Sequence, residues 1–286
     1  MTANDLAVTA FVVRRVTTGE SDLVLSLLTR ERGKIDVYAR AGRRSRRRFQ
    51  AGLSPCLLFQ GMIAPSRRGS SRPGSLWSLE EMIVARPAAL LTSRPSRMVV
   101  GQYATELVRE FCPPEVPEPE LFQHLDDFLV RLDQPRSPTW RDWFALEWSV
   151  LTAAGVAPEL RACVLCRRPA PGRRPGSGGP SDGSGGPSGA SGEPSGGSGG
   201  RSAAGPSWGF SEAAGGLVCP SCGRSPAMPV WNPAWNDILD GTGSGPDPED
   251  APALLALLEP WIFQVLNRKL HARGLCRSIF SSPTEW

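Results

Sequence analysis

Four of the seven cysteines form two C-x-x-C pairs, a spacing typical of a metal site. The pairs are Cys163 with Cys166, in RACVLCRRP, and Cys219 with Cys222, in GGLVCPSCG. Two residues between thiolates let one tight turn direct both sulfurs at a single ion, and two such turns complete a tetrahedral zinc site. The pairs therefore predict one structural Zn²⁺ per chain. Because four thiolates leave no open position for water, this set does not favour catalysis by the metal.

Two other interpretations of the pairs are a redox C-x-x-C motif and four unrelated core thiols. The redox motif would need a βαβ context that the sequence lacks. The 52 residues between Cys166 and Cys219 exceed the usual zinc-ribbon spacing, but most of the excess is a stretch at 171–200 in which 25 of 30 residues are Gly, Ser or Pro. This composition predicts a disordered loop, about 171–206, that can loop out at modest entropic cost. The remaining cysteines, Cys56, Cys112 and Cys276, are expected to be small buried hydrophobic residues.

A second chemical feature is the run ARAGRRSRRRF, with six arginines in the nine residues 40–48. Clustered cations bind polyanions by releasing counterions, and the guanidinium group binds phosphate through two parallel hydrogen bonds. We therefore predict a flexible DNA-binding loop at the tip of a hairpin; a merely solvated surface loop is the alternative. The predicted DNA-binding residues are Arg14, Arg15, Lys34, Arg40, Arg43, Arg44, Arg46, Arg47, Arg48, Arg67 and Arg68.

Two details refine this prediction. Neighbouring residues of a strand point to opposite faces, so only one of Arg14 and Arg15 should face the nucleic acid. Four aromatic residues could stack on bases, although most strand aromatics belong to a core. They are Phe11, Tyr38, Phe49 and Trp77.

The elements that must position these residues differ along the chain. Five segments rich in β-branched and aromatic residues and separated by turn signals predict strands at 6–16, 22–29, 34–40, 55–64 and 75–85. Five such strands with a basic loop resemble an OB-fold β-barrel. Apolar residues at helical spacing then predict helices around 100–111, 121–132, 140–151 and 254–265, the last kinked or restarted at Pro260. Ser137 and Pro138 are the expected start of the third helix.

The sequence thus predicts an α+β multidomain chain. We expect an OB-fold nucleic-acid-binding domain at 1–85, a helical domain at 86–162 and 226–286, and a zinc module at 163–225. Residues 1–80 carry fourteen Arg or Lys and six Asp or Glu, whereas the whole chain has a net charge of +4. The front part is therefore +8 and the rest −4, which suggests a polyanionic partner docked at the front.

The predictions on cellular location and catalysis rest mainly on motifs that the sequence lacks. The sequence shows no signal peptide and no apolar run of about 18 residues, so we expect a cytoplasmic, nucleoid-associated protein. It has no Walker loop, H-E-x-x-H or G-x-S-x-G motif, so we expect no enzyme activity. His124 and His271 are expected to be surface or capping residues rather than ligands, and Glu80 and Glu81 to be exposed on a strand.

Several of these features occur together in one known family. GESDLVLSLLTRERGKIDVYARAGRRSRRRF resembles the N-terminal signature of the RecO family of bacterial recombination mediators, and PELRACVLCRRP with WGFSEAAGGLVCPSC resembles its zinc segment. The resemblance covers the chain except about 171–206. It implies an N-terminal OB domain, a helical domain, a zinc module, binding to single- and double-stranded DNA, and annealing of complementary strands. The enlarged loop between the cysteine pairs departs from the family pattern.

The resemblance also implies partners. They are the RecR protein, the C-terminal tail of the single-strand-binding protein and, indirectly, the RecA recombinase. An arginine beside an apolar groove would suit that acidic tail, with Arg109, Arg131 and Arg141 as possibilities. The main alternative is an RNA- or ribosome-associated OB and zinc binding module, and a metal-dependent nuclease is disfavoured by the closed zinc set.

Overall fold

The computed structural model describes residues 5–65, 76–171, 208–223, 239 and 251–282 of the chain. The chain divides into two compact units, Met1–Ala157 with Gly243–Trp286, and Pro158–Thr242. The first unit holds both the strands of the predicted barrel and the helices, so the domain bounds at 85 and 86 stay a prediction. Arg67, Arg68 and the Gly/Ser/Pro segment at 172–206 lie outside the described residues.

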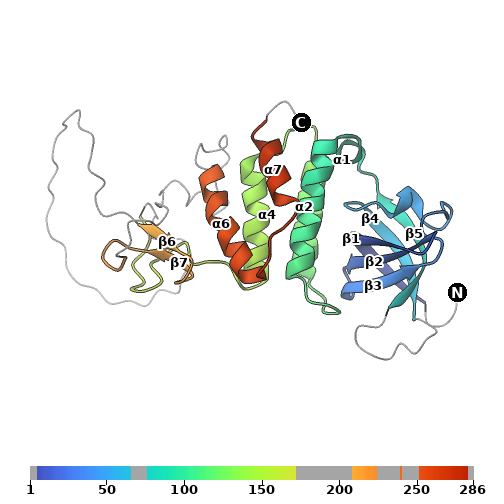
Figure 1. The fold of residues 1–286 in the computed structure, drawn as a ribbon, viewed down its shortest axis with the longest axis horizontal. Coiled ribbons are helices and arrows are strands. Elements are labelled where there is room, and N and C mark those ends of the chain that lie inside the picture. The colour runs from blue at the N-terminus through green and yellow to red at the C-terminus, as the bar shows by residue number, and fades with distance from the viewer. Residues whose placement is uncertain (1–4, 66–75, 172–207, 224–238, 240–250, 283–286) are drawn as a thin grey trace, which may run out of the picture. The chain divides into compact units, whose positions relative to one another are not determined.

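The first unit begins with a closed five-stranded barrel, as predicted (Figure 1). Its strands, in spatial order β1-β2-β3-β5-β4, are β1 (Leu6–Thr18), β2 (Asp22–Thr29), β3 (Gly33–Ala39), β5 (Trp77–Arg86) and β4 (Leu58–Ala64). Alternate residues fill the interior: Leu23, Leu25 and Leu27 of β2 are all fully buried. Burying each of these side chains stabilises the fold by roughly 1.5–3 kcal/mol. The exposed positions predicted for Glu80 and Glu81 are also observed.

The hairpin expected around residues 40–48 is wrong, because β3 and β4 are not neighbours. β3 pairs with β2 and, in parallel, with β5, whereas β4 pairs with β1 and β5. Residues 40–57 therefore form the crossover that closes the barrel and include the short helix η1 (Gln50–Leu53). Phe49 and Leu53 of this crossover belong to the buried barrel core. Local sequence patterns predict strands but not their pairing order, so the crossover looked like a hairpin.

Six helices are described after the barrel. They are α1 (Ala89–Ser93), α2 (Pro95–Phe111), α3 (Pro119–Leu132), α4 (Trp140–Ala153), α6 (Ala251–Leu266) and α7 (Arg273–Phe280). The predicted apolar stripes are largely buried, including Val100, Leu107, Leu125 and Leu258. None of the described helices is long and apolar enough to cross a membrane.

Two helix details differ from the predictions. α4 is capped by Thr139 rather than started by Ser137 and Pro138, because Thr139 and Asp142 form a reciprocal capping box. The backbone N–H of Thr139 donates to the Asp142 carboxylate at 2.9 Å, and the N–H of Asp142 donates to Thr139 Oγ1 at 3.3 Å. α6 is one helix that contains Pro260, so of the predicted kink or restart only the restart is wrong.

A buried charge ties the helices together. Glu147 of α4 is fully buried and accepts hydrogen bonds from the Tyr103 hydroxyl of α2 and from Trp143 Nε1 at 2.7 Å. Arg273 of α7 donates to both carboxylate oxygens of Glu147, at 2.9 and 3.0 Å. Because such a pair is costly to break once buried, it fixes α2, α4 and α7 in one arrangement.

The turn between β2 and β3 connects the barrel to the segment that follows α2. The N–H of Glu115 donates to the carbonyl of Lys34 at 2.8 Å. Gly33 has φ +67°, and a Cβ atom at this position would lie 1.8 Å from the carbonyl oxygen of Val116. Only glycine allows this approach.

We predict that Gly33→Ala lowers the free energy of unfolding by about 3 kcal/mol or more, since left-handed strain adds to a backbone clash. Gly19→Ala is the matched control, because Gly19 also has a left-handed φ of +57° but open space around its Cβ position. It should cost only about 1 kcal/mol. Urea unfolding followed by circular dichroism measures both, and equal losses of stability would contradict the importance of the close approach to Val116.

Candidate nucleic-acid interface and candidate metal centre

Residues 40–48, here called the arginine segment, present most of their guanidinium groups to solvent. Five of the six arginines are exposed, and Arg48 is half-buried. The exposed ones are Arg40, Arg43, Arg44, Arg46 and Arg47. Arg44 has a nearby carboxylate, Glu20, at 4.0 Å, but a surface pair at this distance contributes little and leaves the cation available.

The backbone of the arginine segment is a series of hydrogen-bonded turns rather than an open loop. The N–H of Ser45 donates to the carbonyl of Ala41 at 2.9 Å, and the N–H of Phe49 to the carbonyl of Ser45 at 3.1 Å. The segment is anchored to the barrel as well: the N–H of Arg43 donates to Ser21 O at 2.9 Å, and the N–H of Met82 donates to Arg48 O at 2.7 Å. The backbone is therefore held in place while the side chains project into solvent.

Arg48 is the one arginine of the segment that is not exposed; Arg43 is exposed, although its guanidinium also donates to a backbone carbonyl, that of Glu20, at 3.2 Å. The guanidinium of Arg48 donates to the carbonyl of Arg40 at 2.6 Å and lies over the ring of Phe49, 4.8 Å from the centroid. These interactions close the arginine segment on itself. Arg48 thus helps to build the segment, and the exposed arginines are the ones whose guanidinium groups can reach a polyanion.

Arg14 and Arg15 lie on the β1–β2 ribbon and are both exposed. The register pairs Arg14 with Ser26, whose hydroxyl bonds Asp36 on β3, and pairs Arg15 with the core residue Leu25. Residues directly opposite share a face of a sheet, so Arg14 belongs to the outer face and Arg15 to the inner row. Arg15 is nevertheless exposed, since the described pairing of β1 with β4 ends at Phe11.

Lys34 lies away from the arginine segment, at the opposite end of β3. Its ammonium donates to the carbonyl of Arg109 in α2 at 2.7 Å, and burial lowers its pKa. This placement gives Lys34 a role in joining the barrel to the helices. Its predicted contact with DNA stays a prediction.

The four aromatic candidates for base stacking divide into two groups. Phe11 and Phe49 are buried, with Phe11 packed on Phe122 at 5.2 Å between ring centroids, so they belong to the core, as was expected of most of these aromatics, and cannot stack on bases. Tyr38 and Trp77 are partly exposed. Trp77 already stacks under the guanidinium of Arg32, at 4.8 Å. Strand periodicity alone could not separate these groups, because it shows neither that Phe122 of α3 covers Phe11 nor that Phe49, in the crossover, enters the barrel core.

The second unit brings the four predicted metal-ligating cysteines together. Their sulfur atoms all lie within 4.8 Å of one another. Two strands, β6 (Gly209–Ser211) and β7 (Gly216–Val218), lead into the second C-x-x-C pair. The carbonyl of Glu159 accepts from the N–H of Leu217 at 2.8 Å, which aligns the chain before the first pair with β7.

This geometry fits a metal ion with tetrahedral coordination. With metal–sulfur bonds of about 2.3 Å, sulfur atoms at the corners of a tetrahedron are about 3.8 Å apart; the four sulfur atoms lie within 4.8 Å of one another, and those of Cys166 and Cys219 are 3.5 Å apart. Burial opposes ionisation of Cys163, but the N–H groups of Cys219, Cys166 and Leu165 lower its pKa to about 6. Hydrogen bonds with the thiols of Cys219 and Cys166, in contrast, raise the pKa of Cys222 to about 12. The cluster could therefore hold a metal ion through thiolate ligands, and zinc is the ion that such a set favours.

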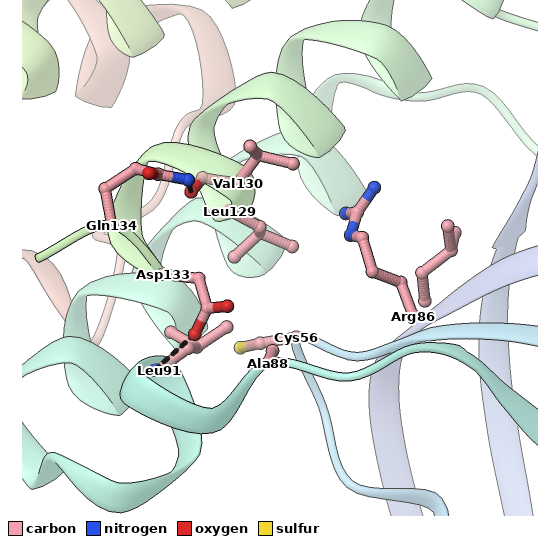
Figure 2. Close-up of a pocket in the computed structure, with 9 residues that line it drawn as sticks. Cys56, Arg86, Ala88, Leu91, Leu129, Val130, Asp133 and Gln134 are labelled. Carbon is pink, nitrogen blue, oxygen red and sulfur yellow. Dashed lines mark hydrogen bonds between the residues drawn. The ribbon is translucent and has the colours of Figure 1, made fainter.

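The three other cysteines are buried, as predicted. Cys56 lines a pocket of about 110 Å³ in the first unit, near Arg86, Leu91 and Asp133 (Figure 2). Figure 2 shows that Asp133, the residue after α3, points toward Leu91 of α1. Its carboxylate accepts a hydrogen bond from the N–H of Leu91 at 2.9 Å. Burial raises the pKa of Cys56 to about 12, so this thiol is not an activated nucleophile.

Comparisons with known proteins place the chain beside one family of DNA repair proteins. Residues 1–72 match the family model "Recombination protein O N terminal", and residues 93–196 match "Recombination protein O C terminal". The chain is similar to the DNA repair protein RecO of Myxococcus xanthus, with 31% identity over 267 residues that cover 91% of this chain and 92% of that protein.

Other relatives match over a shorter stretch. The DNA repair protein RecO of Anaeromyxobacter sp. strain Fw109-5 is 40% identical over 163 residues, which cover 56% of this chain and 60% of that protein. The RecO protein of Pelobacter propionicus is 32% identical over 161 residues, 56% of this chain and 62% of that protein. The matched part thus spans about three fifths of these two relatives.

We predict that the purified protein contains about one zinc ion per chain and that the double variant Cys163→Ser, Cys219→Ser contains almost none, because two of four thiolate ligands are removed. Elemental analysis of the dialysed proteins measures this. The variant should also unfold at a lower temperature. Cys112→Ala is the control, since it removes a thiol outside the cluster and should keep the metal. Wild-type protein without zinc and with an unaltered melting temperature in the double variant would refute the metal site.

We also predict that Cys56 resists alkylation by iodoacetamide at pH 8. With a pKa of about 12, only about one thiol in ten thousand is ionised at that pH, and the thiolate is the reacting form. Its reactivity should rise with pH and after unfolding in urea. Peptide mass spectrometry can compare Cys56 with Cys166, which is exposed and should be alkylated once metal has been removed. Rapid labelling of Cys56 in folded protein would contradict this assignment.

Proposed function

Because the chain belongs to the RecO family of DNA repair proteins, we propose that it is a recombination mediator that binds single- and double-stranded DNA and anneals complementary strands. The observation that carries the proposal is the arginine segment, with five exposed guanidinium groups on an anchored backbone. Releasing the counterions condensed on a phosphate backbone supplies most of the affinity of such a surface.

The location of the arginine segment supports the proposal as well. It adjoins the turn between β1 and β2, and the ribbon formed by these strands carries Arg14 and Arg15. A DNA strand lying across the segment could thus meet further cations on the barrel. Since the guanidinium groups bind phosphate rather than base edges, the bases of the bound strand would stay free to pair.

Annealing follows from this binding mode. Two complementary strands repel each other through their phosphates, and a dense set of cations neutralises both and raises their local concentration. No covalent bond is made or broken, so the activity needs no nucleophile, general acid or general base. We propose that the protein is not an enzyme and that the cysteine cluster holds a structural zinc ion.

The partners proposed are those that the family suggests. We propose that the protein works with RecR and the tail of the single-strand-binding protein to load the RecA recombinase onto DNA. Among the three arginines considered for the acidic tail, Arg109 pairs with Glu110 at 2.6 Å and Arg131 lies 3.9 Å from Asp142. An incoming carboxylate would have to compete with these acids.

The central test replaces four of the five exposed arginines, Arg43, Arg44, Arg46 and Arg47, by Ala and leaves Arg40 and Arg48 intact. We expect the affinity for a single-stranded oligonucleotide to fall by more than about tenfold at 0.1 M salt. The slope of log K against log salt should become shallower by up to about 3, or about 0.7 for each phosphate that is no longer neutralised. Fluorescence anisotropy across a salt series measures both quantities.

The matched control replaces the same four residues by Lys, which keeps the charge and should restore most of the salt slope. An RNA oligonucleotide of the same sequence, used as competitor, tests the alternative of an RNA-binding module. Annealing of complementary strands coated with the single-strand-binding protein then tests the mediator role. DNA binding and annealing that survive the Ala substitutions unchanged would show that the arginine segment is a bystander.

A further inference from the structure

One acidic side chain lies at the base of the arginine segment and contacts its backbone. Asp22, the first residue of β2, accepts a hydrogen bond through Oδ1 from the N–H of Ala41, at 2.7 Å. Its other carboxylate oxygen, Oδ2, accepts from the hydroxyl of Tyr38 on β3. One carboxylate thus joins the start of β2, the end of β3 and the first turn of the arginine segment.

The residue that Asp22 holds has an unusual backbone conformation. Ala41 has φ +55°, in the left-handed region that residues other than glycine rarely adopt. Three further hydrogen bonds depend on this turn: Gly42 N to Ala39 O at 3.1 Å, Arg44 N to Ala41 O at 3.0 Å and Ser45 N to Ala41 O at 2.9 Å. Ala41 therefore sets the direction in which the exposed arginines leave the barrel, and Asp22 supplies an acceptor that keeps this strained turn in place.

A carboxylate among arginines is unexpected on electrostatic grounds alone. Asp22 places a negative charge beside the surface that binds polyanions in the proposed function, where it repels phosphate. The hydrogen bonds from Tyr38 and Ala41 lower its pKa, so it stays ionised at neutral pH. If Asp22 acted only through its negative charge, it would weaken DNA binding. We therefore expect any favourable contribution of Asp22 to DNA binding to come from its hydrogen bonds.

We propose that Asp22 is a positioning residue for DNA binding, whose carboxylate holds the turn at Ala41 so that the exposed guanidinium groups face one phosphate backbone together. This inference rests on the proposed function, because it concerns how the same arginine segment recognises DNA. The ligand class is a phosphodiester strand, single or double.

Asp36 provides a matched control on the neighbouring strand β3. It is exposed, and its carboxylate accepts from the hydroxyl of Ser26 at 2.6 Å. Asp22→Ala and Asp36→Ala each remove one negative charge from the barrel. Simple electrostatics predicts tighter DNA binding for both variants, whereas the positioning role predicts weaker binding for Asp22→Ala alone.

The experiment measures binding of full-length variants to a single-stranded oligonucleotide by anisotropy over a salt series. For Asp22→Ala we expect affinity to fall about three- to tenfold, with a salt slope shallower by about 0.7 to 1.4, as when one or two fewer phosphates are neutralised. For Asp36→Ala we expect affinity that is unchanged or up to about twofold tighter. Hydrogen exchange of the peptide covering 41–49 should accelerate in Asp22→Ala and not in Asp36→Ala.

Tyr38→Phe separates positioning from general destabilisation. It removes one hydrogen bond to Asp22 but keeps the carboxylate and the bond from Ala41, so its loss of affinity should be smaller than that of Asp22→Ala and its salt slope near the wild-type value. If circular dichroism shows that Asp22→Ala does not fold, the positioning role is tested with Tyr38→Phe instead, by its DNA affinity and by hydrogen exchange of its 41–49 peptide. Faster exchange with weaker binding then supports the positioning role, and unchanged exchange and binding overturn it.

The two proposals fail in different ways. If wild-type protein does not bind DNA, the proposed function fails and the positioning role falls with it. If wild-type protein binds DNA, the Arg-to-Ala variant does not, and Asp22→Ala binds as tightly as Asp36→Ala, only the positioning role is overturned.

Discussion

Closure of the five-stranded barrel is the constraint on which the arginine segment depends. Because β3 pairs with β2 and β5 while β4 pairs with β1 and β5, the chain must cross one end of the barrel between β3 and β4. A crossover of this kind needs apolar anchors, and Phe49 and Leu53 supply them inside the core. The residues before these anchors are consequently held at the rim of the barrel, and they are the arginines.

The same constraint separates what the sequence could predict from what it could not. Strand periods of two residues and turn signals located all five strands within a few residues of their observed bounds, because alternating burial is a local property. Pairing order is not local, so the crossover was mistaken for a hairpin. Lys34 shows another non-local feature: its predicted contact with DNA stays a prediction, and its observed hydrogen-bond partner is the carbonyl of Arg109, 75 residues away in sequence.

The cysteine cluster illustrates the opposite case. The C-x-x-C spacing by itself predicts local geometry, since each pair occupies one tight turn. Only the proximity of the two turns depends on the fold. That proximity depends on backbone pairing of Glu159 with β7, which no composition or period could predict. The many residues between the pairs did not prevent it, as expected when a long insertion costs only a logarithm of its length in closure entropy.

A fixed backbone with adjustable side chains suits a ligand of variable shape. Single-stranded DNA has no single conformation, so a rigid array of guanidinium groups would match few of its states, whereas a disordered loop would lose backbone entropy at every binding event. In the proposed function the arginine segment would avoid both costs, because its turns are already hydrogen-bonded to the barrel and only the long arginine side chains would need to adjust. The proposed positioning role of Asp22, whose carboxylate accepts a hydrogen bond from the N–H of Ala41, fits this division. The repulsion between one carboxylate and the phosphates would cost little binding free energy compared with the conformational entropy lost if the whole segment had to become ordered on binding. A binding surface of this kind would derive its affinity from charge and its speed of rearrangement from side chains, the combination that the proposed annealing of two mobile strands requires.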